Sequence, residues 1–498
     1  MIKLSADPTS PLGSFGLDHF MKKYGFPVTT GDSSIEILYQ KGDVIPPKNC
    51  LHIPVQDNLI QKKLELTELD GGGVSANLDI FQKIGIELTS TSEFRKSPTS
   101  TPVEDMEARL FSKIREMCSQ AGIPLAYKPF WPNGAKFALA LTHDVDEVKK
   151  TYQYLTHLAK SVLRRDITAM KGQIASMKDK LTGYEPYWTF GKIKKIEEKF
   201  KCTSSLYFLQ EEGKVEPTKL KSWFLAARRY SYSDEKILKV IRELDDGGWE
   251  VGLHGSYNSF ADEEQLGKEK KALDEVLGRP VIGTRQHHLN LEVPKTWRIQ
   301  QGIGLKYDSS LGFKDTNGFR AGTCFPFHPF DYELGRGLDI LELPLTFMDT
   351  TLFSRRNEFW NVFQPLISTV EENRGLFTLL FHTSTFNNNE YPGWIEYYSG
   401  ILDYARQRGA WITNGQRIAE WWIDRQNKEL SLERHASEYK ISCGSGLPGN
   451  QLLIQVPKDM TLSSTQKEIR IIKCSNSDVL IEPKTDEELC EVEFRLKK

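Results

Sequence analysis

The sequence predicts an α/β fold for residues 131–428, built on a parallel sheet or a (β/α) barrel. In this region short strand-like apolar runs alternate with segments whose apolar residues recur at helical spacing. The strand-like runs are mostly continuous rather than alternating, which is typical of strands covered on both faces. The flanking residues differ in texture, so we expect this chain of 498 residues to hold three domains, 1–130, 131–428 and 429–498.

Residues 1–130 predict a small α/β accessory domain, in which short apolar runs are separated by turn-rich stretches. Its clearest element is a helix over residues 104–121, where Met106, Leu110 and Ile114 recur at helical spacing. No cluster of histidine and acidic residues accompanies these elements. We therefore expect this domain to be dispensable for the chemistry of the protein.

Eight strands are expected in the central region. The strand-like runs span residues 137–142, 204–209, 249–254, 281–285, 305–307, 338–346, 377–382 and 410–413. Helical patterns lie between many of them, one with Ile193 and Phe200 on a single face and another with Ile237 and Leu244 on a single face. The pair Gly247-Gly248 follows the second pattern, as the C-terminal cap of a helix would.

Residues 429–498 predict a small all-β domain. Residues 491–496 alternate strictly between polar and apolar side chains, and residues 468–471 do the same. Short alternating strands of this kind, separated by Gly, Pro, Asn and Ser, are typical of an antiparallel β structure.

Composition and charge narrow the functional classes. Apolar residues make up 39% of the chain, and 65 basic residues against 67 acidic ones leave a net charge of −2, which does not favour nucleic-acid binding. No apolar run is long enough for a transmembrane helix, and the first residues lack the apolar core of a secretory signal. Seven scattered cysteines fit reduced thiols. We therefore expect a cytoplasmic protein.

One segment departs from this balance. Residues 149–180 contain eight basic residues and only two acidic ones, Asp166 and Asp179. The basic residues are at positions 149, 150, 160, 164, 165, 171, 178 and 180. The simpler interpretation is a solvated helix face. The alternative is contact with a phosphate-bearing substrate or a membrane surface, so peripheral membrane contact stays open.

Histidines and acids gather where the predicted strands end. Five of the ten histidines lie at four such ends, accompanied by two aspartates and an arginine. These residues are His143, His254, His287, His288, His382, Asp144, Asp146 and Arg285. In a parallel barrel the reactive groups collect at the C-terminal ends of the strands. Histidine and carboxylate ligands with a nearby base and acid indicate metal-assisted hydrolysis.

The ordered motifs resemble those of the polysaccharide deacetylase family, of the carbohydrate esterase family 4 type. Thr-His-Asp-Val-Asp at residues 142–146 is similar to the first motif of that family. His254-Gly-Ser-Tyr-Asn258 lies where the family has His-x-x-x-His, and Arg-Gln-His at 285–287 resembles the arginine-bearing motif. Leu-Leu-Phe-His at 379–382 resembles the last motif. The set spans roughly residues 135–428 and looks like the variant subgroup with a His-Asp-Val-Asp first motif.

This resemblance implies a distorted, incomplete (β/α) barrel that removes acetyl groups from N-acetylated sugars. It implies that Asp144 is the general base, that Arg285 orients and tunes it, and that His382 is the general acid. Leu380 is expected to help form the acetyl pocket. Asp308 is a further candidate, as the carboxylate that orients His382. His143 and His288 are expected to be structural.

The resemblance also implies a divalent metal held by Asp146 and His254, with zinc as the expected ion. The third ligand stays open between two residues. Asn258 stands where the family has its second histidine, and an amide oxygen is a poor zinc ligand. His287 could instead complete the set from the neighbouring strand.

The expected reaction is metal-dependent hydrolysis of an N-acetyl group, or a related acyl group, on an amino sugar of a cell-surface polysaccharide or its precursor. The substrate could be a lipid-linked or nucleotide-linked sugar. Two alternatives stay open. One is a carbohydrate-binding pseudoenzyme, in which Asn258 marks a lost metal site. The other is a metal-independent amidohydrolase that resembles allantoinase on the same fold.

Overall fold

The computed structural model describes the chain apart from a few short segments. These are residues 8–9, 30–33, 43, 57–62, 90–97, 164, 166, 212–217, 219–222, 224–229, 436–437, 445, 465, 467, 476, 485–487 and 498. The basic residue at position 164 and the acidic residue at 166, counted above in the basic segment, therefore lie outside the described residues.

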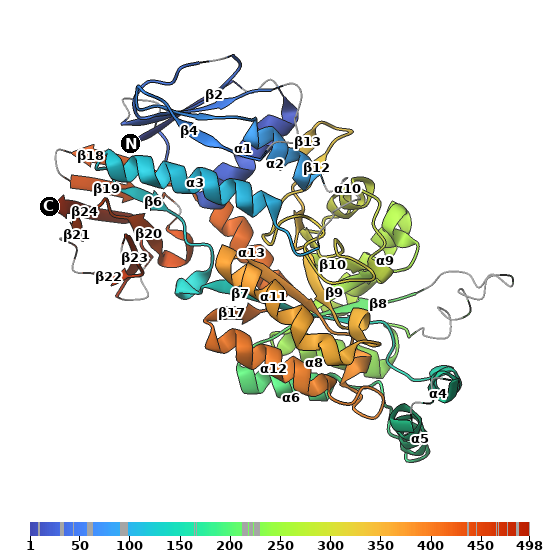
Figure 1. The fold of residues 1–498 in the computed structure, drawn as a ribbon. Helices are drawn as coiled ribbons and strands as arrows, with labels where there is room; N and C mark the ends of the chain where they lie inside the picture. The colour runs from blue at the N-terminus through green and yellow to red at the C-terminus, as the bar shows by residue number, and fades with distance from the viewer. Residues whose placement is uncertain are drawn as a thin grey trace.

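A nine-stranded parallel sheet forms the central region (Figure 1). Its order is β14-β11-β10-β9-β8-β7-β16-β15, with β17 paired to the first half of β7. The strands are β7 (Phe137–Val145), β8 (Ser205–Leu209), β9 (Glu250–Gly255), β10 (Gly283–Gln286), β11 (Tyr307–Asp308), β14 (Leu341–Glu342), β15 (Leu345–Met348), β16 (Leu376–Leu380) and β17 (Ala410–Thr413). The end strands β14 and β15 do not pair, so the barrel is incomplete.

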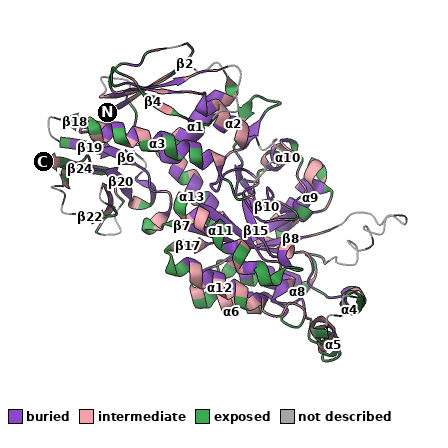
Figure 2. Ribbon diagram, in the orientation of Figure 1, coloured by how far each residue is buried: buried purple, intermediate pink, exposed green. Residues whose placement is uncertain are grey.

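All eight expected strands are present, and one of them is divided. The run 338–346 forms the two short strands β14 and β15, which lie at opposite edges of the sheet. The strands β7, β8, β9, β10 and β16 are buried along their whole length (Figure 2). For β7, β8 and β16 this agrees with their largely apolar runs. The α/β class and the distorted barrel are therefore confirmed.

Helices pack around this sheet. They are α6 (Phe190–Phe200), α8 (Glu235–Asp246), α9 (Glu263–Leu277), α10 (Lys295–Gly302), α11 (Phe359–Asn373), α12 (Trp394–Gln407) and α13 (Gly415–Asn427). Helix α8 buries Ile237, Val240, Ile241 and Leu244 and is capped at Gly247, as expected. Two further helices, α4 (Gln153–Leu163) and α5 (Ile167–Leu181), project from the barrel as a hairpin (Figure 1). No described helix combines the length and apolar character needed to cross a bilayer.

The N-terminal region is an α/β unit, as predicted. Its five strands have the order β1-β2-β3-β5-β4 and are β1 (Ile2–Ala6), β2 (Ile35–Gln40), β3 (Cys50–Pro54), β4 (Leu66–Glu68) and β5 (Val74–Ala76). Helices α1 (Pro11–Tyr24) and α2 (Ile80–Leu88) pack together, and α3 (Pro102–Gln120) is the helix expected over 104–121.

The C-terminal region is all-β, and one of its sheets contains a strand from much earlier in the chain. One sheet is β18-β19-β24-β21 and the other is β22-β23-β20-β6. The strands are β18 (Ser431–His435), β19 (Glu438–Ser442), β20 (Leu452–Gln455), β21 (Thr461–Ser463), β22 (Ile469–Lys473), β23 (Asp478–Pro483), β24 (Glu491–Lys497) and β6 (Leu125–Tyr127). Because β6 pairs with β20, the regions predicted as terminal domains share a sheet.

One buried arginine joins the N-terminal region to the barrel. Arg425 on α13 is fully buried, and burial lowers its pKa to about 9. Its guanidinium donates to the backbone carbonyls of Lys22 (3.1 Å), Pro129 (2.7 Å), Lys128 (3.2 Å) and Lys23. It therefore satisfies carbonyls of two chain segments at once.

We expect Arg425→Met to lower the free energy of unfolding by at least about 2 kcal/mol, because the methionine fills the space but leaves several buried carbonyls without a donor. Urea unfolding of the full chain measures the shift in midpoint. Arg417→Met, on the exposed face of the same helix, is the control and should leave the midpoint in place. Equal midpoints for the two variants would contradict the role of Arg425.

Candidate metal centre and active site

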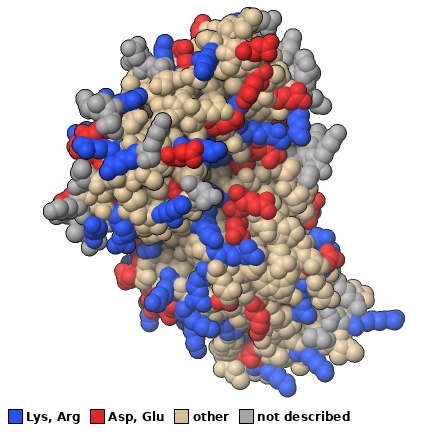
Figure 3. All heavy atoms as spheres, turned by 60° about the vertical axis from the view of Figure 1, so that its left-hand side comes forward, with Lys and Arg blue, Asp and Glu red and all other residues tan. Residues whose placement is uncertain are grey.

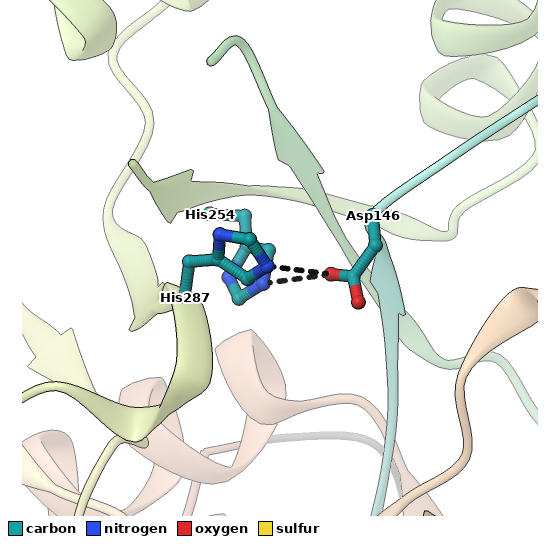
Figure 4. Close-up of side chains that lie close together, drawn as sticks. All are labelled: Asp146, His254 and His287. Carbon is teal, nitrogen blue, oxygen red and sulfur yellow. Dashed lines mark hydrogen bonds and ion pairs between the residues drawn. The ribbon is translucent and has the colours of Figure 1, made fainter. Parts of the chain in front are cut away.

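Three donor side chains converge at the C-terminal ends of three strands of the sheet (Figure 4). Asp146 follows β7, His254 lies near the end of β9, and His287 directly follows β10. One ligand atom from each lies within 4.8 Å of the others. The parallel register brings Arg285 of β10 opposite His254 of β9, so the two histidines leave the sheet side by side.

His254 has the orientation of a metal ligand. Its Nδ1 lies 2.8 Å from the backbone carbonyl of Arg285, to which it donates, and its Nε2 lies 3.1 Å from Oδ1 of Asp146. Burial disfavours the imidazolium, but the carboxylates of Asp144 and Asp146 outweigh it and raise the pKa of His254. A carbonyl that fixes Nδ1–H leaves Nε2 to face the site, which is the usual arrangement around a metal-bound histidine.

Asp146 is the group on which the histidines converge. Burial alone would raise its pKa, but the hydrogen bond from His254 and the nearby rings of His287 and His382 hold it well below its usual range. The carboxylate is therefore ionised over the ordinary pH range, as a ligand carboxylate must be.

His287, and not Asn258, lies beside this pair. The Nε2 atom of His287 is 3.9 Å from Oδ1 of Asp146, and its Nδ1 is 3.8 Å from a carboxylate oxygen of Glu211. Asn258 is exposed just before the short turn Ser259–Ala261, and the described residues show no interaction between it and Asp146. The geometry favours His287 as the third donor.

Asp144 is held by a fully buried arginine. The Arg285 guanidinium donates to Oδ1 of Asp144 (3.1 Å), to the hydroxyl of Thr142 (2.7 Å), and to the backbone and side-chain oxygens of Ser309 (2.9 and 2.8 Å). The other carboxylate oxygen of Asp144 lies 3.6 Å from Nε2 of His254. One oxygen is thus fixed by Arg285, and the second faces the donor cluster.

His382 also approaches the cluster. Its Nε2 lies 3.9 Å from Oδ2 of Asp146. Its Nδ1 donates to Oδ1 of Asp349 at 2.7 Å, and its backbone N–H donates to the second oxygen of Asp349, also at 2.7 Å. Burial disfavours the charged ring, but Asp349, Asp146 and Asp144 outweigh it and raise the pKa of His382 to about 10.

The expectation that Asp308 orients His382 is wrong. Asp308 accepts a hydrogen bond from Ser310 at 2.6 Å and lies beside the carboxyl of Glu342, so its carboxyl is engaged elsewhere in the barrel. Asp349, which sequence reasoning missed, takes this role from the end of β15. The sequence contained part of the signal, because Asp349 is an acid that follows a strand. The predicted strand ended at residue 346, so Asp349 was not recognised as lying at a strand end.

The remaining predicted residues lie around the centre. His143 turns to the opposite side of β7, where Nδ1 bonds the Phe381 carbonyl (2.7 Å) and Nε2 bonds Glu197 (3.0 Å), in line with a structural role. His288 is exposed beside His287. Leu380 is buried in a small apolar cluster with Leu289, Leu345 and Met348, next to the strand end that carries His382.

We expect Asp349→Asn to reduce kcat by about 10–100-fold with little change in KM. A neutral amide stabilises the protonated ring of His382 less than the carboxylate does. Steady-state kinetics on the acetylated sugar expected from the sequence measure the effect. Asp308→Asn, the acid first considered for this role, is the matched control and should keep wild-type kcat. A larger loss in the Asp308 variant would contradict the assignment.

The arrangement defines a class of site: two histidines and an aspartate that can hold a divalent cation, flanked by a carboxylate and by a histidine with its own carboxylate.

No family model and no curated protein matches this chain. Several solved structures are similar to it. A Mycobacterium smegmatis protein described provisionally as a polysaccharide deacetylase matches with 18% identity and a TM-score of 0.39, covering 61% of this chain and 96% of that one.

Two others differ in their described activity. Puue allantoinase matches with 16% identity and a TM-score of 0.38, covering 60% of this chain and 93% of that one. A pseudoenzyme of the CE4 family from Bacillus anthracis matches with 12% identity and a TM-score of 0.29, covering 58% of this chain and 66% of that one.

Proposed function

We propose that this chain is a metal-dependent hydrolase that removes an acetyl or related acyl group from an amino sugar. One observation carries the proposal: an oriented base and an oriented acid lie within 4 Å of the Asp146–His254–His287 cluster. Asp144 approaches His254 at 3.6 Å, and His382 approaches Asp146 at 3.9 Å. A carbohydrate-binding protein needs neither an acid nor a base, so this pair supports an enzyme over a pseudoenzyme.

The donor set fits a divalent ion such as zinc. Zinc with bonds of about 2.0–2.2 Å holds four-coordinate ligand atoms about 3.4 Å apart. The distances from Oδ1 of Asp146 to the Nε2 atoms of His254 and His287 are 3.1 and 3.9 Å, on either side of that value. Bound here, the ion would supply Lewis-acid polarisation of the acyl carbonyl and lower the pKa of a water molecule.

Asp144 is the proposed general base. Its free oxygen faces the donor cluster, while Arg285 holds the other oxygen, so the carboxylate cannot rotate away. A carboxylate in this position can take the proton from the attacking water as the oxygen adds to the acyl carbon.

His382 is the proposed general acid. Asp349 fixes its Nδ1–H, so the proton on Nε2 points into the site, and the pKa of about 10 keeps this proton in place near neutral pH. As the carbon–nitrogen bond breaks, Nε2 gives its proton to the departing amine of the sugar. The base thus acts beside His254 and the acid beside Asp146.

The sugar substrate is proposed from the ordered deacetylase motifs and from the apolar cluster around Leu380. An acetyl methyl group needs a small apolar pocket, and Leu380 and Met348 lie at the strand ends next to His382 and Asp349. We propose that the sugar is carried by a lipid or a nucleotide.

Metal analysis together with acetate release tests the proposal. The purified full chain should hold about one zinc ion and release acetate from an N-acetylated amino sugar, and a chelator should abolish turnover until zinc is restored. Turnover that survives complete chelation would instead indicate a metal-independent amidohydrolase. Absence of both metal and turnover would indicate the pseudoenzyme.

A further inference from the structure

The α4–α5 hairpin exposes an unusual share of the apolar side chains of the protein. Fifteen large apolar residues are exposed in the described part of the chain, and seven of them lie between residues 155 and 184. These seven are Leu155, Val162, Leu163, Ile167, Ile174, Leu181 and Tyr184. Such a concentration on one projecting element marks an interaction surface.

The first helix of the hairpin has mostly polar side chains inside. On α4 the buried residues are Gln153, Tyr154 and Ser161, and His157 is half-buried. The outward positions Leu155 and Val162, seven residues apart, are 72% and 51% exposed. Residues spaced by seven lie on one face of a helix, so the outward face is an apolar stripe.

The second helix repeats this pattern. Ile167, Ile174 and Leu181 are each seven residues apart and 67%, 49% and 88% exposed, while Gln173 and Ser176 are buried. A helix of a monomeric globular protein normally buries its apolar face. We call the outward side chains of Leu155, Val162, Leu163, Ile167, Ile174 and Leu181 the hairpin surface.

Contacts on the polar side fix this orientation. The Gln173 side chain accepts a hydrogen bond from Lys150 (2.7 Å), and Asp179 accepts one from Asn389 (2.8 Å). Gly172 lies so close to the chain that an added Cβ would be 1.8 Å from the Asn389 carbonyl oxygen. The hairpin cannot turn its apolar stripe inward without breaking these contacts.

Positive charge surrounds the hairpin surface. Exposed Lys160, Arg165, Lys171 and Lys178 lie among the apolar side chains, and Asp179 is engaged by Asn389. Figure 3 shows Lys and Arg side chains projecting at the lower end of the molecule, where the hairpin lies. A second copy packed on the same surface by two-fold symmetry would place these cations against each other. An anionic bilayer accommodates both the apolar stripe and the cations.

We propose that the α4–α5 hairpin docks this protein onto an anionic lipid bilayer. The hairpin surface enters the boundary between headgroups and acyl chains, and the surrounding lysines contact lipid phosphates. On the opposite, polar side of the hairpin, a cavity of about 810 Å³ separates it from the segment after β15, lined by His157 and Ser161 on one side and by Thr350 on the other.

This position has a consequence for the substrate, which rests on the proposed function. Thr350 follows Asp349, the partner of His382, so one wall of this cavity is next in the chain to the partner of the proposed acid. Docking by the hairpin would hold the protein at the surface where a sugar on a membrane-embedded lipid carrier is presented.

Vesicle binding by the full chain tests the docking surface. We expect co-sedimentation with vesicles of phosphatidylcholine and phosphatidylglycerol, weakened by high salt, and little binding to phosphatidylcholine alone. The double variant Leu163→Asp with Leu181→Asp should weaken binding by at least about tenfold. Ile45→Asp is the matched control, because Ile45 and Leu163 are both 84% exposed. It should bind as the wild type does.

Three outcomes would overturn the docking proposal: no binding to anionic vesicles, equal binding by the double variant, or a wild-type dimer that the double variant dissociates. The last would identify a second copy as the occupant. Acetate release from a soluble sugar without vesicles is measured on the same preparations. If the wild type releases no acetate, the proposed hydrolase activity is contradicted, while the vesicle-binding result still stands. Thermal unfolding checks that the variants are folded.

Discussion

Replacing Asp144 with Asn is expected to lower turnover by about 10²–10⁴-fold while metal content stays at the wild-type level. The amide has nearly the shape of the carboxylate and can still accept the hydrogen bond that Arg285 Nη1 donates to Oδ1 of Asp144, at 3.1 Å in the wild type. It cannot take a proton from water. The loss should therefore appear in kcat, measured by acetate release from an N-acetylated amino sugar.

Asp146→Asn provides the comparison that separates the two aspartates. This variant should lose metal, since Asp146 is the carboxylate on which His254 converges at 3.1 Å. If Asp144→Asn lost the metal and Asp146→Asn kept it, the two roles would be exchanged. If neither change altered hydrolysis, the proposed mechanism would be wrong.

Replacing His254 with Ala is expected to remove the metal and to lower turnover by on the order of 10³-fold or more, because two ligands are too few for a stable site. His254 is the donor with the best-fixed geometry, since the Arg285 carbonyl holds its Nδ1 at 2.8 Å. Metal content after dialysis and turnover should fall together. His288→Ala, at the exposed neighbour of His287, is the control and should retain both.

The same measurement identifies the third ligand. His287→Ala should lose metal, whereas Asn258→Ala should keep it, because Asn258 is exposed and His287 lies beside Asp146. The reverse result would indicate that Asn258, and not His287, is the third metal ligand.

Much of the barrel could be predicted because strand burial leaves a local signal. A strand covered on both faces must be apolar along its length, so β7 and β16 are visible as continuous runs. The ends of these runs then located Asp144, Asp146 and His382, since the carboxyl ends of parallel strands share one edge. The helix α8 was visible for a similar reason, because its buried residues recur at helical spacing.

Pairings between distant segments were not predictable. Asp349 precedes His382 by 33 residues in the sequence, and only the adjacency of β15 and β16 places them 2.7 Å apart. The strand Leu125–Tyr127 is too short to identify alone, and its pairing with β20 joins positions more than three hundred residues apart. Such contacts depend on how the elements pack, and no local pattern encodes that packing.

The sequence by itself determined the kind of fold and the chemistry of the candidate residues, because burial period and side-chain type are properties of short segments. Tertiary structure alone decided which residues meet. It brought His287 rather than Asn258 beside Asp146 and gave His382 its partner Asp349. It also turned the polar face of α5 inward, because Lys150 and Asn389 hold it there, so that an apolar pattern normally buried faces outward.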